Sequence, residues 1–163
     1  EQWFKKDDAF DAVLQDKFEP TLGKALAGKL DGWADTLDGC LALIIVLDQF
    51  TRNIHRDTPR AFAGDEMALA LALRCIDRGY LETPDTNYRH FMLMPLMHSE
   101  DLSIQDMSLP LFEKHTQPRT LDFAQRHRDI VAKFGRFPHR NAILGRPSSS
   151  AETEFLTQPG SSF

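Results

Sequence analysis

Three short segments concentrate the side chains whose types and spacing could do chemistry. In the first, Asp48 and Arg52 lie four residues apart at the end of an apolar run, with Gln49 between them. This spacing places the carboxylate and the guanidinium on one face of a helix. Because an isolated buried charge is very costly, both groups need polar partners. The pair therefore either fixes the loop after the helix or, with Gln49, lines a pocket.

The second segment, residues 95–101, brings His98 together with Glu100 and Asp101. Acids in the first turn of a helix are favoured by the helix dipole, and Ser99 is a natural cap for such a helix. His98 is less ordinary there, and with Glu100 it could form a proton-transfer pair. A metal site is the rival interpretation, but His-x-Glu lacks the spacing of strong zinc motifs. We expect no metal and take His98 and Glu100 as the candidate catalytic pair.

The third segment, residues 134–146, is rich in groups that can donate hydrogen bonds to an anion. Guanidinium groups suit carboxylates and phosphates because their N–H groups form a planar fork. Alternatively, the arginines bind carbonyl groups at helix ends and the acids of the second segment. On the preceding helix, His127 is predicted to face inward, where a histidine more often completes a core than binds a ligand. The candidate ligand-binding residues of this region are His127, Arg136, His139, Arg140 and Asn141, with Arg146 close by.

Helices must position these segments, because no stretch alternates with the period of two that a half-buried strand shows. The fold class is therefore all-α, and we expect one domain of antiparallel helices over residues 1–163. Breaks are expected near Pro20, near Asp57, over residues 79–86 and over residues 135–148, where caps, glycine and proline coincide. The predicted helices are Phe10 to Pro20, Thr21 to Ala27, Leu37 to Asn53, Pro59 to Arg78, one ending at Pro95, Ser99 to Lys114 with a kink or break at Pro110, Thr120 to Phe134, and a short last helix with a Ser149-x-x-Glu152 capping box.

Length and charge narrow the classes of protein that the sequence can encode. A chain of 163 residues with 42% hydrophobic and 26% charged residues is typical of an ordinary globular domain. Its net charge of -5 argues against general nucleic-acid binding, which needs a basic surface. Residues 114–146 nevertheless hold eight Lys or Arg against two acids. This basic segment either docks on the acidic remainder or meets an external anionic partner.

The apolar runs and the cysteines indicate a cytoplasmic protein. The longest apolar run, Cys40 to Leu47, is far shorter than the roughly 20 residues of a membrane-spanning helix, so we expect no membrane partner. Cys40 and Cys75 are the two cysteines, and both fall inside apolar helical patterns. They are predicted to be buried, unbonded thiols in a reducing compartment.

Three segments together resemble the bacterial family called domain of unknown function 924. They are Leu47-Asp48-Gln49-Phe50-x-Arg52-Asn53-Ile54-x-Arg56, Pro95-Leu96-Met97-His98-Ser99-Glu100-Asp101 and Phe134-Gly135-Arg136-Phe137-Pro138-His139-Arg140-Asn141. The resemblance covers nearly the whole chain, with the three motifs in the family's order. It implies an all-helical fold related to tetratricopeptide-repeat proteins and no established activity. It also implies that a tryptophan-rich segment precedes Trp3-Phe4 in the full protein.

The function hypothesis is a pocket in which the three segments converge on a small anionic metabolite. Arg136 and Arg140 would hold the anion, and His98 with Glu100 would transfer a proton if catalysis occurs. Whether the protein is an enzyme stays open, because the chain has no glycine-rich phosphate loop, nucleophile elbow or cysteine cluster, and no cofactor is expected. The rival hypothesis is an interaction module with a groove for a peptide, a partner helix or a second copy. A third gives the polar groups a structural role only.

Overall fold

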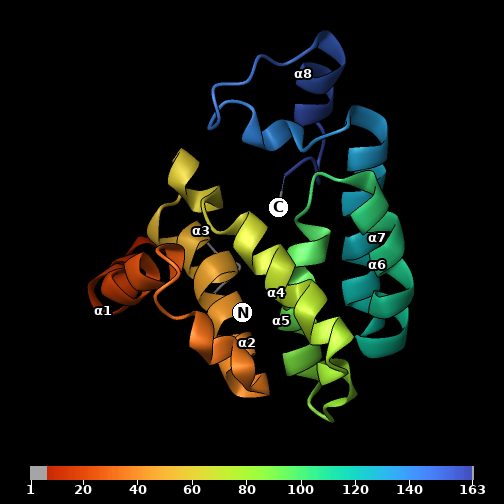
Figure 1. The fold of residues 1–163 in the computed structure, drawn as a ribbon. Helices are drawn as coiled ribbons and strands as arrows, with labels where there is room; N and C mark the ends of the chain where they lie inside the picture. The colour runs from red at the N-terminus through yellow and green to blue at the C-terminus, as the bar shows by residue number, and fades with distance from the viewer. Residues whose placement is uncertain (1–6, 163) are drawn as a thin grey trace.

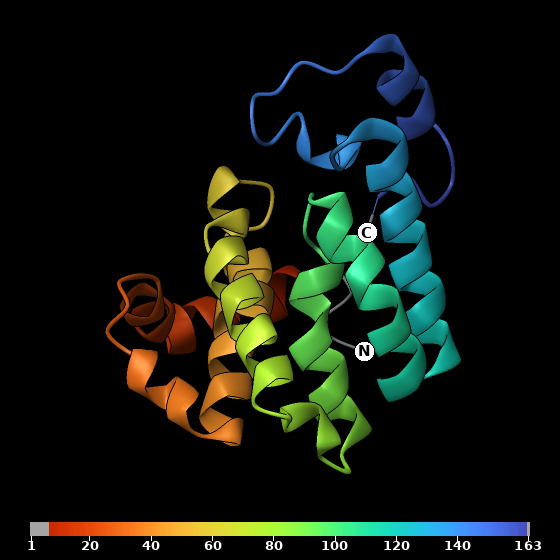
Figure 2. The same cartoon turned by 45° about the vertical axis from the view of Figure 1, so that its right-hand side comes forward.

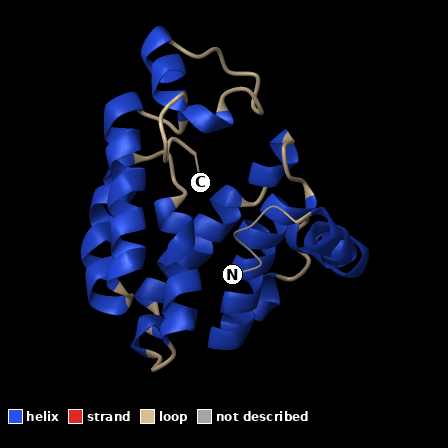
Figure 3. Ribbon diagram, turned by 180° about the vertical axis from the view of Figure 1, so that it is seen from behind, coloured by secondary structure: helices blue, strands red, loops and turns tan. Residues whose placement is uncertain are grey.

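The computed structural model describes residues 7–162, and all regular structure in this range is helical (Figure 3). This confirms the all-α prediction; the expectation about the segment before Trp3 lies outside the described residues. The α-helices are α1 (Asp8–Leu26), α2 (Leu37–Ile44), α3 (Thr51–Ile54), α4 (Asp65–Asp77), α5 (Thr86–Met97), α6 (Leu102–His115), α7 (Pro118–Phe134) and α8 (Ser150–Leu156). Short 3₁₀ turns are η2 (Asp31–Asp35), η4 (Pro59–Phe62), η5 (Tyr80–Glu82) and η6 (Pro138–Arg140), and η3 (Ile45–Phe50) is a π-helical turn.

Helices α2, α4, α5, α6 and α7 lie side by side in chain order and alternate in direction (Figures 1 and 2). The amino-terminal helix α1 packs on η3 and α3 beside this array. Because the helices alternate, the ends of α3, α5 and α7 meet the starts of α4 and α6 at one end of the array. The loop over residues 135–148 and α8 cover this same end (Figure 2). Three segments far apart in the sequence are thereby brought together.

Small side chains allow α4 to pack closely between α2 and α5. Ala68, Ala72 and Cys75 follow one another at helical spacing and are fully buried. Helix α4 therefore packs closely on α2 on one side and α5 on the other. Leu93 and Leu96 of α5 are also fully buried in this core. The core holds the helix ends, and hence the polar segments, in fixed positions.

The predicted helix from Leu37 to Asn53 is present, but it contains a π-helical turn that its apolar pattern does not reveal. Residues Ile45–Phe50 form this turn between α2 and α3, and Thr36 caps the start through its hydroxyl. A π turn inserts one extra residue and rotates the following side chains around the axis. Asp48 lies within the turn and is 1% exposed.

Two predicted helix boundaries at proline are wrong, because α1 and α5 continue through Pro20 and Pro95. Helix α6 also continues through Pro110, which excludes the break but not the kink considered there. A proline removes one backbone hydrogen bond and crowds the preceding turn, a cost that packing can outweigh. In α1 the buried Leu14 and Leu22 lie on either side of Pro20 and both contact the core. Pro20 and Pro110 are exposed, so water can reach the carbonyl groups that they leave unpaired.

Two predicted helix starts are also displaced. Helix α6 begins at Leu102 and is capped by Asp101 rather than Ser99, so Glu100 precedes the helix instead of lying in its first turn. Thr58 and Pro59 open the 3₁₀ turn η4, and α4 starts only at Asp65. The predicted breaks at Asp57, after Gly79 and at Gly135 are confirmed, as is the capping box of α8.

Candidate functional site

A closed ring of polar contacts lies where the helix ends meet. His98 Nδ1 is 2.7 Å from Asp48 Oδ1, which also lies 2.9 Å from Arg52 Nη1. The same Arg52 nitrogen is 3.0 Å from Asp65 Oδ1. The other oxygen of Asp65 accepts from Arg140 Nη1 at 3.2 Å, and Arg140 Nη2 donates to the His98 carbonyl at 3.0 Å. We call these five residues the polar ring; they come from η3, α3, α4, η6 and the end of α5.

Asp48 is the most enclosed charge of the polar ring. Its carboxylate accepts from Gln49 Nε2 as well as contacting Arg52 and His98. Burial acts to raise the pKa of Asp48, but Arg52, His98 and Gln49 together hold that pKa well below its usual range. Asp48 is therefore an anion that fixes the Nδ1 side of the His98 ring. His98 Nε2 has no hydrogen-bond partner among the described residues, and its side chain is 14% exposed.

Arg140 is held between two aromatic rings. Its guanidinium carbon is 4.7 Å from the centroid of Phe62 and 4.6 Å from that of Phe137. Such stacking suits the planar guanidinium and leaves hydrogen bonds only at its edge. The side chain is 8% exposed, and burial lowers the pKa of Arg140 to about 10, against the opposing effect of Asp65. The group still carries its charge at neutral pH.

Two buried donors of the polar ring lack an acceptor within the described part of the chain. They are Arg52 Nη2 and Arg140 Nε. Buried polar groups are normally satisfied, and one left without a partner costs about 1–3 kcal/mol. Both donors belong to the arginines that Asp65 joins, next to His98. One acceptor of the ring, Asp65 Oδ1, likewise has no hydrogen bond among the described residues.

Two further histidines flank the polar ring but are held neutral. The ring of His127, on α7, lies 6.1 Å from that of His98, and its Nδ1 is 2.7 Å from the Phe123 carbonyl. Burial is the main cause that lowers the pKa of His127 to about 3 and that of His139 to about 4. His127 faces inward as predicted, and its hydrogen bond to its own helix fits the core role expected of it.

Glu100 is engaged away from His98, so the structure corrects the proposed His98–Glu100 pair. Its carboxylate accepts two hydrogen bonds from Arg146, at 2.7 and 2.9 Å, and one from the backbone N–H of Phe137 at 2.8 Å. Burial opposes the charged form of Glu100, but Arg146 and the Phe137 N–H leave its pKa lowered. The carboxylate that contacts His98 is Asp48. Glu100 instead ties the loop over residues 135–148 to the start of α6.

Arg136 and Asn141 belong to a second network that folds the same loop onto α8. Arg136 donates to both oxygens of Glu152, at 2.7 and 2.9 Å, and to the Pro147 carbonyl. Asn141 donates to Glu152 and accepts from Arg146. The pKa of Glu152 is lowered, first by Arg136 and then by the backbone N–H of Ser149. Arg136 thus has a carboxylate partner within the chain, which is the structural alternative considered for it above.

Asp65, Phe62 and Phe137 are parts of the site that the sequence interpretation did not include. Asp65 joins the two arginines, and the phenylalanines enclose Arg140. The sequence carried no signal for Asp65, because the predicted helix from Pro59 placed it in the helix interior, whereas it begins α4 in the structure. Among the described residues, no group of three or more His, Cys, Asp or Glu is arranged to hold a metal ion.

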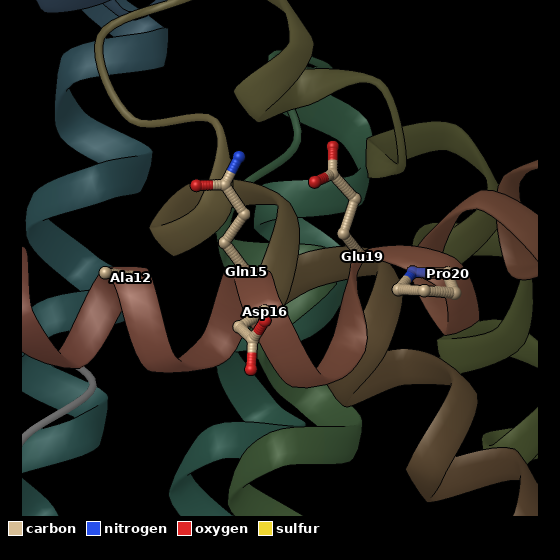
Figure 4. Close-up of a pocket in the computed structure, with 5 residues that line it drawn as sticks. All are labelled: Ala12, Gln15, Asp16, Glu19 and Pro20. Carbon is tan, nitrogen blue, oxygen red and sulfur yellow. The ribbon is translucent and has the colours of Figure 1, made fainter.

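Two surface depressions lie along α1, away from the polar ring. The larger, of about 540 Å³, is lined by Ala12, Gln15, Asp16, Glu19 and Pro20 (Figure 4). Gln15 and Glu19 point to the same side of α1 in this view, and Asp16 points away from them. The smaller, of about 260 Å³, includes Asn53 and Arg56, which both donate to Asp11. Neither depression contains a residue of the polar ring.

The fold and the polar ring define a class of helical-array proteins with charged groups gathered at one end of the array. The chain belongs to the family described as "Bacterial protein of unknown function (DUF924)", which matches residues 1–160. A solved structure similar to it is that of a protein of unknown function, ATU0120, from Agrobacterium tumefaciens, with 39% sequence identity and a TM-score of 0.89. This likeness covers 94% of the present chain and 87% of the other. A search of curated proteins found no match.

None of the helices in residues 7–162 has both the length and the apolar character of a membrane-spanning segment.

Proposed function

We propose that the polar ring binds a small anionic metabolite and that Asp48 and His98 form its proton-transfer pair. Arg52 and Arg140 supply the hydrogen bonds to the anion, and Asp48 orients the His98 imidazole so that Nε2 faces the ligand. The observation that carries the proposal is the pair of buried guanidinium donors without an acceptor among the described residues, beside His98. Arg136, Glu100 and Asn141 act by positioning the loop that carries Arg140.

The π-helical turn supports a functional origin for the polar ring. Such turns are rare and are found frequently at functional sites, because they change which side chain faces inward. Here the turn carries Asp48 and Gln49, both buried, and the second hydrogen-bonds to the first. A solely structural ion pair between Asp48 and Arg52 would need only an ordinary helix, since their spacing already suits one.

A thermal-shift screen with small carboxylates and phosphates tests this proposal. A ligand that binds only the folded protein raises its melting temperature in proportion to the logarithm of its concentration. We expect at least one anion to stabilise the wild type and not the Arg140→Gln variant. The matched control is Arg126→Gln on the exposed face of α7, which should keep the full shift. A shift that survives in Arg140→Gln would overturn the assignment of the site.

The surface gives less support to the interaction-module hypothesis. Exposed large apolar side chains among the described residues come from α1, η2, α6, α7, α8 and the loop before α8. Apolar residues scattered singly over a surface are normal and do not form a groove. A peptide, helix or second copy as partner therefore stays a prediction, as do the relation to tetratricopeptide repeats and the cytoplasmic location.

A further inference from the structure

The charges of the polar ring cancel when His98 is neutral. Asp48 and Asp65 supply two negative charges, and Arg52 and Arg140 supply two positive ones. An anion that enters this ring meets hydrogen-bond donors but no net positive charge. A buried uncompensated charge is very costly, so binding needs a further cation.

Within the polar ring, His98 is the group that can supply that cation by taking up a proton. The neighbouring His127 and His139 stay neutral because burial lowers their pKa values to about 3 and about 4, and burial also lowers the pKa of His90. The positive charge of Arg146 is matched by Glu100 through two hydrogen bonds. His98 remains, and a proton on its Nε2 would leave the contact between Nδ1 and Asp48 intact. The charged or titratable groups around His98 are Asp48, Arg52, Asp65, His90, Glu100, His127, His139 and Arg140.

We infer that the ligand is a carboxylate and that it enters together with one proton, which His98 holds on Nε2. This inference rests on the proposed function of the polar ring. With His98 protonated the ring carries one positive charge, which a carboxylate balances and a phosphate dianion exceeds. A carboxylate offers two acceptor oxygens, and Arg52 Nη2 and Arg140 Nε are two buried donors that lack an acceptor among the described residues. No covalent bond other than N–H forms, and the proton comes from the solvent.

Nuclear magnetic resonance on the wild-type protein tests the inference without any substitution. Sodium acetate is titrated at slightly alkaline pH and constant ionic strength, while the His98 Cε1–H and Arg140 Nε–H signals are followed. We expect the Arg140 signal to shift and the His98 signal to move towards its imidazolium position. His115, at the end of α6, serves as an internal control whose signal should stay in place. Sodium phosphate should have a smaller effect at equal concentration.

The possible outcomes separate this inference from the proposed function. If the Arg140 signal shifts and that of His98 does not, proton uptake is overturned while the anion site stands. If neither signal responds to any anion, the proposed function itself fails. A phosphate effect equal to or larger than that of acetate overturns the choice of a carboxylate.

The pH dependence of acetate binding gives a second test. One coupled proton makes the half-saturating acetate concentration rise by up to about tenfold per pH unit on the alkaline side. In His98→Gln, which can still donate to Asp48 but cannot take up the proton, acetate should bind more weakly and the response of the Arg140 signal should lack this dependence. His115→Gln should behave as the wild type. Retention of the wild-type pH dependence in His98→Gln would contradict the inference.

Discussion

Each charged side chain of the polar ring contacts at least two polar groups, which explains how four full charges persist at the edge of the core. Asp48 has three side-chain partners, and Arg52 Nη1 also donates to the Asp48 carbonyl at 2.7 Å. Removing one member of a buried ion pair is costly because its partner is left charged and desolvated. The same cost applies to the hydrogen bonds between Arg136 and Glu152, which hold the loop over residues 135–148 on α8.

Arg136 provides a direct test of this rule. The side chain of its partner Glu152 is 4% exposed, so we expect Arg136→Gln to lower the free energy of unfolding by more than the loss of an exposed ion pair does. Urea unfolding measures this as a lower midpoint at unchanged slope. The matched control is Arg126→Gln, whose partner Asp122 is exposed and whose loss should cost less than about 1 kcal/mol. Equal small losses in both variants would show that Glu152 does not depend on Arg136.

Acid should destabilise the protein well above the range in which carboxylates titrate. The folded pKa of His127 is about 3 against an ordinary value of 6.5, so below pH 6.5 the unfolded chain binds a proton that the folded chain does not. The stabilisation is complete above that pH and is lost as the pH falls towards 3. One such histidine contributes a slope of up to about 1.4 kcal/mol per pH unit. In His127→Gln the free energy of unfolding, measured with urea between pH 3 and 6.5, should change less steeply with pH than in the wild type. An unchanged dependence on pH would contradict the prediction.

At the scale of the elements, the backbone of the π-helical turn packs directly against Gly64, the residue before α4. A Cβ atom built on Gly64 would lie 2.2 Å from the carbonyl oxygen of Leu47. Gly64 precedes Asp65, so this close approach sets the distance from the π turn to the acid that joins the two arginines. The need for glycine here is one of space, because its φ of -96° is open to any residue.

Two glycine-to-alanine substitutions should therefore have opposite effects. In Gly64→Ala the backbone of the π turn or of α4 must move, and we expect a loss of about 2 kcal/mol or more in the free energy of unfolding. In Gly23→Ala, inside α1, a Cβ meets nothing within 4 Å. That variant should gain about 0.5–1 kcal/mol from helix propensity. Denaturant unfolding of the pair checks both signs, and a neutral Gly64→Ala would show that the two elements are not in tight contact.

Helix ends marked by local chemistry could be predicted, whereas ends that depend on packing could not. Gly135 ends α7 and Ser149 caps α8, because a left-handed residue or a side-chain cap acts within one turn of the chain. The continuation of α1 through Pro20 depends on residues of other helices. The π turn likewise leaves the apolar run before Asp48 unchanged, so composition gives no sign of it.

At the scale of the whole molecule, Cys40 of α2 and Cys75 of α4 are free thiols that contact each other where the two helices pack. Cys40 Sγ and Cys75 Sγ are 3.2 Å apart, and both side chains are fully buried. We expect neither thiol to react with an aromatic disulfide reagent in the native protein and both to react after unfolding. Spectrophotometric thiol counting checks this, with reduced glutathione as the reference. Rapid reaction of the native protein would show that α2 and α4 separate easily.

The convergence of the three motifs could be predicted, since alternating helices bring successive ends together. Asp48, Arg52, His98 and Arg140 are joined in one ring, and Gln49 contacts it. The pairing within it could not be predicted, because His98 is two residues from Glu100 in sequence yet contacts Asp48, 50 residues away. Asp65 was missed for the same reason, since only the folded chain brings it to Arg140, 75 residues further on.

These long separations in sequence affect how the protein folds while the ribosome synthesises it. Contacts between residues distant in sequence carry a large loop-closure cost and form late in folding. Helices α1 to α5 can begin to associate as they leave the exit tunnel, but the ring stays open until Arg140 has been synthesised. During that interval Asp65 and the His98 carbonyl lack the guanidinium that joins them, and Phe62 lacks the cation that stacks on it. A nascent chain stalled before residue 140 therefore has most of its core but not its site.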